Sequence, residues 1–259
     1  MGRLEVAGCG KVFQKEGASF CALEPVTFHV DDGRFVSIIG PSGCGKSTLF
    51  NMIAGLLQPT SGDILLDGHS IVGRTGRVGY MLQKDLLLPW RTIVDNVILP
   101  LEIRGLSKKE AHEKAMPLLR SHGLGGFESA HPAALSGGMR QRAALIRTLL
   151  DDKAVMLFDE PFGALDAQTR LHMQNHLLSI WQASGKTVLF VTHDIDEAIY
   201  LSDEIVVFSA HPGRMKTSIP VELPRPRGGQ TFLDERFAQL KKRLMCLLDE
   251  MSIEEAAET

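Results

Sequence analysis

One stretch of nine residues constrains this chain more than any other. Residues 40–48 read GPSGCGKST, which fits the phosphate-binding pattern G-x-x-x-x-G-K-[ST] at every position. Glycines allow successive backbone N–H groups to turn toward a polyphosphate, because no Cβ atom stands in the way. Lys46 can reach the β- and γ-phosphates, and the Ser47 hydroxyl can bind Mg²⁺. The candidate phosphate-binding residues, called the phosphate loop below, are Gly40, Pro41, Ser42, Gly43, Cys44, Gly45, Lys46, Ser47 and Thr48.

The residues around the phosphate loop favour a nucleotide site over a glycine-rich turn that binds nothing. Residues 35–39 are almost all apolar and predict a buried strand, and residues 48–54 predict a helix. A helix N-terminus that faces phosphate adds backbone donors and a favourable dipole.

Two further apolar runs, residues 154–158 and 187–191, match the run before the phosphate loop. Continuous hydrophobicity is typical of parallel strands that are covered on both faces. Each run is followed by polar residues, Asp159 and Glu160 in one case and 192–194 in the other. Because ligands bind beyond the carboxyl ends of such strands, the three strand ends predict one shared site.

The rest of the chain divides by pattern. Short strands with turns, at about 1–37 and 60–82, predict an antiparallel sheet, and about 84–150 predicts a helical insertion. These belong to one domain over 1–230, and 231–259 is expected to be a C-terminal amphipathic helix and tail. Residues 222–227 contain two prolines and favour an extended linker before that helix.

Asp159 and Glu160 are the candidate catalytic carboxylates. Phosphoryl transfer from ATP needs a carboxylate for Mg²⁺, here Asp159, and a group that orients or deprotonates water, here Glu160. The alternative is a pair of exposed acids at the end of a strand.

A second helix N-terminus is expected at Ser136, which stands where an N-cap residue belongs. Gly137 and Gly138 follow in the first turn, although glycine costs about 1 kcal/mol relative to alanine inside a helix. Their presence suggests that a ligand approaches this backbone; the alternative is an ordinary capped helix.

Taken together, these motifs resemble the ATP-binding subunit of an ABC transporter over nearly the whole chain. The resemblance implies an α/β fold, with a P-loop NTPase (RecA-like) core around a parallel sheet. It also implies an N-terminal antiparallel β subdomain and an inserted helical subdomain. The further matching motifs are the Q-loop glutamine Gln83, the signature at 135–139, the D-loop at 164–166 and the switch histidine His193.

The resemblance also implies how the site works. Two subunits pack head to tail, and ATP lies between the phosphate loop of one and Ser136, Gly137 and Gly138 of the other. Phe13 is expected to stack on the adenine, with Phe20 as the alternative because 14–20 looks like a small insertion; either ring could instead be core. Asp166 is expected at the dimer interface. Mg²⁺ would be held by Ser47, Gln83 and Asp159, and the catalytic residues would be Glu160, His193 and Gln83.

The implied partners are a second copy or a homologous subunit, a transmembrane permease and, indirectly, a substrate-binding protein. Residues 85–91, with Leu88 and Trp90, are the expected permease contact, and a local core is the alternative. The chain would then lie peripherally on the cytoplasmic face of the membrane, since no apolar run approaches about 18 residues. A net charge of −3 gives no general attraction to nucleic acid.

The transported solute is suggested by residues 88–92 and 224–227, which look like the nitrate, sulfonate and taurine importer subgroup. A soluble ABC ATPase of repair, translation or cluster assembly is the alternative, although the chain has neither a long coiled coil nor two nucleotide modules. A P-loop kinase or GTPase would leave 135–139 unexplained. His172 and His176 are interpreted as a polar helix face, and Cys44 as a small loop residue.

Overall fold

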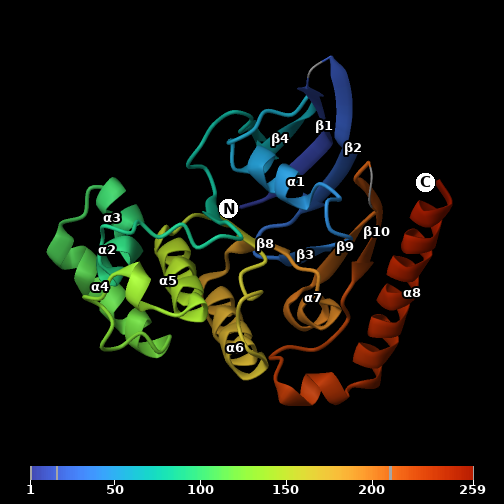
Figure 1. Ribbon diagram of the computed structural model, residues 1–259. Helices are drawn as coiled ribbons and strands as arrows, with labels where there is room; N and C mark the ends of the chain where they lie inside the picture. The colour runs from blue at the N-terminus through green and yellow to red at the C-terminus, as the bar shows by residue number, and fades with distance from the viewer. Residues whose placement is uncertain (1, 16, 210–211, 259) are drawn as a thin grey trace.

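A computed structural model describes residues 2–15, 17–209 and 212–258; the outermost residues of the two predicted domains, 1 and 259, lie outside this part. Figure 1 shows two sheets, with α-helices below the larger sheet, a helical part at one end and a long C-terminal helix at the other. The predicted α/β class is confirmed.

The larger sheet has six strands in the order β10-β9-β3-β8-β7-β6. All neighbouring pairs are parallel except β9 and β10, so β10 is an antiparallel edge strand. The strands are β3 (Phe35–Ile39), β6 (Gly79–Met81), β7 (Val155–Asp159), β8 (Thr187–Val191), β9 (Glu204–Ser209) and β10 (Arg214–Pro220).

The apolar runs are explained by burial on both faces of this sheet. Phe35 and Ile39 of β3 point into one core, which they share with α6 (Ala167–Ser184) and α7 (Ile195–Leu201). Val36 and Ile38 point into a second core, which they share with the smaller sheet and α1 (Lys46–Ile53). Because successive side chains alternate between faces, both sets must be apolar.

The smaller sheet is antiparallel, with the order β2-β1-β4-β5. Its strands are β1 (Leu4–Lys15), β2 (Ala18–Val30), β4 (Ser61–Leu66) and β5 (His69–Ser70). The expectation of short N-terminal strands was wrong, because β1 and β2 form one hairpin of 12 and 13 residues. Phe13 pairs with Phe20, and Gln14 with Ser19, at the end of this hairpin.

The helical part has its own apolar core. It contains α2 (Ile93–Val97), α3 (Leu99–Ile103), α4 (Lys108–Ser121) and a short 3₁₀ turn over Pro132–Ala134. The long helix α5 (Gly137–Leu150) contributes Ala143 and Ile146 to this core and Ala144 and Leu145 to the core below the sheet. Helix α5 thus joins the helical part to the sheet.

The C-terminal region contains a 3₁₀ turn, Gly229–Leu233, and α8 (Glu235–Glu258). The preceding segment is extended, but it is fastened to the core. The Arg227 guanidinium is only 8% exposed and donates to the carbonyls of Ile199, Tyr200 and Ser202 at the end of α7. A cation is favoured there because those carbonyls form the negative end of a helix dipole. Among the described residues, no helix has the length and apolarity to cross a membrane.

Candidate functional site

The phosphate loop joins β3 to α1 at the centre of the large sheet. Gly45 is the N-cap of α1 and has φ 85°, which favours glycine. A Cβ at this position would also stand 2.8 Å from the carbonyl oxygen of Ala22. The Lys46 ammonium is buried in the loop and donates to the carbonyls of Gly40 and Pro41 at 2.8 and 2.7 Å. The loop therefore holds a positive charge against a helix N-terminus.

Ser47 and Asp159 meet across the site. The Ser47 hydroxyl donates to Asp159 Oδ2 at 2.8 Å, which brings together α1 and the end of β7. Burial raises the pKa of Asp159 above its usual value, and the hydrogen bond from Ser47 opposes this shift. A hydroxyl and a carboxylate are oxygen ligands of the kind that Mg²⁺ takes, and a cation would offset the cost of burying the carboxylate. The donor set therefore fits Mg²⁺.

Glu160 lies between the Q-loop glutamine and the switch histidine. Gln83 Nε2 donates to Glu160 Oε2 at 3.0 Å, and His193 Nδ1 lies 3.4 Å from Glu160 Oε1. Glu160 has φ 48°, in the left-handed region that a residue with a Cβ rarely adopts. Its backbone N–H donates to the Val191 carbonyl at 2.9 Å. Strained backbone of this kind is concentrated at functional sites, and here it fixes where the carboxylate points.

A pocket of about 370 Å³ lies over these groups. The phosphate loop forms its floor, and Gln83, Asp159 and Glu160 form one side. Phe13 and Phe20 both line it and are both exposed, so the two candidate aromatic residues stand at the same place on the hairpin. Neither ring belongs to the buried core.

Ser136, Gly137 and Gly138 are absent from the described residues that line this pocket. Ser136 is the N-cap of α5, as predicted, and its Oγ accepts from the N–H of Met139 at 3.3 Å. Packing within the chain explains the glycine at position 138, because a Cβ there would stand 3.0 Å from Leu165 Cδ2 in the D-loop. Around Gly137, in contrast, the nearest atom to an added Cβ is 3.8 Å away. Its backbone is open to an approaching ligand.

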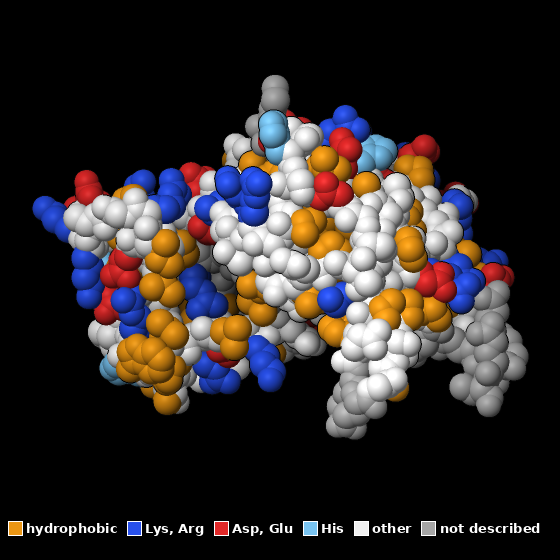
Figure 2. All heavy atoms as spheres, turned by 90° about the horizontal axis from the view of Figure 1, so that it is seen from above, with side chains coloured by type: hydrophobic (Ala, Val, Ile, Leu, Met, Phe, Trp, Pro, Cys, Tyr) orange, Lys and Arg blue, Asp and Glu red, His pale blue; other side chains and the backbone are white. Residues whose placement is uncertain are grey.

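The expected permease contact is a loop held firmly at its base. Arg147 of α5 donates to the carbonyls of Asp85 and Leu86 at 2.6 and 2.9 Å. Asn96 accepts from the N–H of half-buried Leu88 at 2.6 Å. Leu87 belongs to the helical core, but the Trp90 side chain is 72% exposed and is therefore not core. Figure 2 shows further hydrophobic side chains on the surface of the helical part, at the left of the view.

The structure corrects the interpretation of His176 and agrees with that of Cys44. His176 is not on a solvated face, because its ring packs edge to face on buried His122, with centroids 4.0 Å apart. Cys44 is a buried loop residue, as interpreted, and burial raises the pKa of its thiol. No local signal could have revealed the contact between His122 and His176, because they are 54 positions apart in the chain and only the tertiary fold brings the end of α4 beside α6.

Comparison with known proteins agrees with this geometry. Residues 23–163 match the ABC transporter family. An uncharacterised ABC transporter ATP-binding protein of Methanocaldococcus jannaschii is 46% identical over 95% of this chain and 91% of its own length. The aliphatic sulfonates import ATP-binding protein SsuB of Bacillus cereus is 43% identical over 93% of this chain and 94% of its own.

Solved structures agree as well. A dimeric, post-hydrolysis state of the ATP-binding cassette MJ0796, bound to ADP and Pi, superposes with a TM-score of 0.78. It is 30% identical, and the match covers 87% of this chain and 99% of that cassette. Fold, motifs and sequence all lead to the same assignment: the chain belongs to the ABC transporter family and is one of its ATP-binding ATPases.

Proposed function

We propose that this ATPase drives import of a small anion through a separate permease, working as a head-to-tail pair on the cytoplasmic face of the membrane. The observation that carries the proposal is the separation of two nucleotide motifs within one chain. The pocket contains the phosphate loop but not Ser136, Gly137 or Gly138. A second subunit that presents these residues would complete the site, with Asp166 of the D-loop at the interface.

ATP would bind with its phosphates on the N-terminus of α1. Lys46 would exchange its loop carbonyls for phosphate oxygens, and the backbone N–H groups of Gly43 and Gly45 would donate to the same anion. Phe13 is proposed to stack on the adenine, with Phe20 beside it in the hairpin. Ser47, Gln83 and Asp159 would hold Mg²⁺, which neutralises phosphate charge when it is bound.

Hydrolysis would depend on the Glu160 carboxylate. Gln83 and His193 hold it from two sides, so it is oriented before water arrives. In that position Glu160 orients water and accepts its proton during attack. His193 is exposed enough to reach the γ-phosphate while it contacts Glu160. The partner's signature helix would add its N–H groups and its dipole to the same phosphate.

Transport would be coupled through the loop between Gln83 and Trp90. One end of this loop contacts Glu160, and its middle is held by Arg147 of α5, the helix that begins with the signature. Movement of α5 when two subunits close would therefore carry Trp90 with it. An exposed tryptophan on a rigid loop suits a partner surface, and half-buried Leu88 lies two residues before it in the same loop.

For the solute, the choice of a sulfonate-like, taurine-like or nitrate-like anion is supported by this chain's similarity to SsuB, which is named for the import of aliphatic sulfonates. A substrate-binding protein would deliver the anion to the permease.

Affinity purification from membranes tests this proposal against the soluble alternative. We expect a multi-span permease to copurify, and deletion of the gene to abolish uptake of labelled taurine, an alkanesulfonate or nitrate. Copurification of DNA or ribosomes without a permease would favour a repair or translation ATPase instead.

A further inference from the structure

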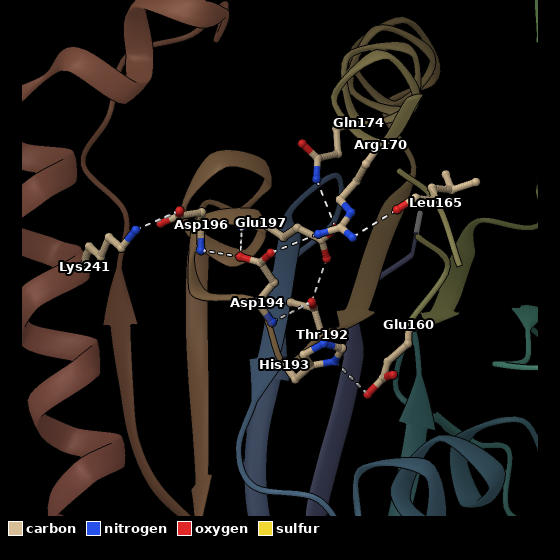
Figure 3. A network of polar contacts seen from close by, with 10 residues as sticks. All are labelled: Glu160, Leu165, Arg170, Gln174, Thr192, His193, Asp194, Asp196, Glu197 and Lys241. Carbon is tan, nitrogen blue, oxygen red and sulfur yellow. Dashed lines mark hydrogen bonds and ion pairs between the residues drawn. The ribbon is translucent and has the colours of Figure 1, made fainter. Parts of the chain in front are cut away.

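Arg170 joins two loops that meet behind the proposed catalytic carboxylate. It lies in the first turn of α6, directly after the D-loop. Its Nη2 donates to the carbonyl of Leu165 at 3.1 Å, and its Nη1 donates to Asp194 Oδ2 at 3.4 Å (Figure 3). One planar guanidinium therefore fastens the D-loop to the segment that carries the switch histidine.

Asp194 in turn shapes the backbone on both sides of His193. Its Oδ1 accepts from the N–H groups of Asp196 and Glu197, at 2.9 and 3.2 Å, and so caps α7. Its own N–H donates to Thr192 Oγ1 at 3.0 Å. His193 thus lies between Thr192 and Asp194, which are hydrogen-bonded to each other, and Arg170 donates a further hydrogen bond to Asp194.

The same guanidinium balances buried negative charge. Glu197 is 7% exposed and accepts from Thr192 Oγ1 at 2.6 Å and from Gln174 Nε2 at 3.0 Å. Arg170 Nε lies 3.9 Å from Glu197 Oε1. Burial raises the pKa of Glu197, and the charge of Arg170 opposes that shift. Without Arg170, two neighbouring carboxylates would lose the cation that they share.

This network reaches the proposed catalytic residues from outside the phosphate pocket. A cavity of about 30 Å³ has Glu160 and His193 on one side and Arg170 and Asp194 on the other. His193 Nδ1 and Glu160 Oε1 lie 3.4 Å apart, whereas Arg170 is not among the described residues that line the phosphate pocket. A change in the D-loop can reach His193 through Arg170 and Asp194.

We propose that Arg170 is a positioning residue for hydrolysis, which couples the D-loop to the switch histidine. The inference rests on the head-to-tail dimer of the proposed function, in which the D-loop lies at the subunit interface. When the partner positions the D-loop, Arg170 keeps the segment that carries His193 at a fixed place relative to the D-loop. His193 then stays in contact with Glu160. In a separated subunit the bonds of Arg170 remain, but no partner sets the position of the D-loop.

Steady-state kinetics of R170M and R170K test the proposal. In R170M we expect kcat for ATP to fall about 10-fold or more, because small misplacements of catalytic groups are costly. KM should stay within about twofold, because Arg170 is not among the described residues that line the phosphate pocket. R170K should show a similar loss of kcat, since one ammonium cannot reproduce the two bonds of the guanidinium fork. The fold of each variant is checked by its melting temperature, and R170K carries the test if R170M does not fold.

K241M is the matched control. It removes an ion pair of 2.8 Å, between Lys241 of α8 and Asp196, from the far side of the same network. This pair is exposed and does not reach the D-loop, so kcat should stay within about twofold of the wild type.

A double-mutant cycle shows whether Arg170 acts through Asp194. We expect R170M/D194N to lose no more activity than the worse single variant, because the two residues form one connection. Losses that multiply, or a wild-type kcat in R170M and R170K, would overturn the inference.

The dimer itself is measured separately, in the E160Q background with ATP. If E160Q fails to dimerise, the proposed function is wrong; if it dimerises and R170K turns over normally, only this inference is wrong.

Discussion

Gly213 lies against the carbonyl of Cys44, so close that a Cβ on Gly213 would stand 2.1 Å from that oxygen. Gly213, the residue before β10, therefore packs against the phosphate loop. The N–H of Glu24 donates to the Gly213 carbonyl at 2.8 Å, which ties Gly213 to β2.

Replacing Gly213 by alanine should displace the phosphate loop. We expect the free energy of unfolding to fall by about 1–3 kcal/mol, the usual cost of overpacking, and ATP affinity to fall with it. Denaturant unfolding and nucleotide titration measure the two effects. G228A is the control, because nothing lies within 4 Å of a Cβ added at that glycine. Equal stability and affinity in G213A and G228A would contradict the supporting role.

The contact between His122 and His176 should make stability depend on pH. Burial lowers the pKa of His122 from 6.5 to about 4, and the neighbouring His176, His172 and Arg142 act in the same direction as burial. Between these two pH values the unfolded chain takes up a proton at His122 that the folded chain does not. The free energy of unfolding should therefore fall as pH is lowered from 6.5 to 4, by on the order of 3 kcal/mol from this group alone.

Urea unfolding at a series of pH values measures this dependence. In H122N the corresponding part of the pH dependence should disappear, so its stability and that of the wild type converge as pH falls. H69N, which replaces an exposed histidine, should follow the wild type at every pH. A constant difference between H122N and the wild type from pH 7 to pH 4 would show that His122 titrates normally when folded.

Trp90 should matter for transport more than for folding. Since its side chain is 72% exposed, W90A should leave the melting temperature unchanged. Solute uptake and stimulation of ATPase by the permease should fall at least about 10-fold, as expected for a tryptophan at the centre of an interface. I103A is the control, because Ile103 is 78% exposed on the same helical part but outside the loop at 85–91. Full uptake by W90A, or equal losses in both variants, would rule out this contact.

The sequence was sufficient for features that depend on consecutive residues. The phosphate loop, the acids after β7 and the histidine after β8 all follow apolar runs, and parallel strands bring their ends together. The cap at Ser136 is similarly local. Local chemistry decides such features, so a short window of sequence is enough to predict them.

Features that depend on distant partners could not be predicted in this way. Residues 222–227 look like a free linker until the carbonyls that bind Arg227 are seen at the end of α7. Arg170 looks like one more charged residue on a helix, because its partners, Leu165 and Asp194, belong to different loops. That Phe13 and Phe20 line the same pocket could not be predicted either, since it depends on the pairing of β1 with β2.

The central claim is that ATP completes its site between two copies of this chain, and light scattering of E160Q tests it most directly. With ATP and Mg²⁺, E160Q should double in mass and show no turnover, because Glu160 is the proposed base. Adding G137D should return the protein to a monomer: the aspartate has room within the chain but would repel the phosphate bound by the partner. An E160Q protein that stays monomeric with ATP, hydrolyses it normally, or dimerises equally well with G137D would contradict the claim.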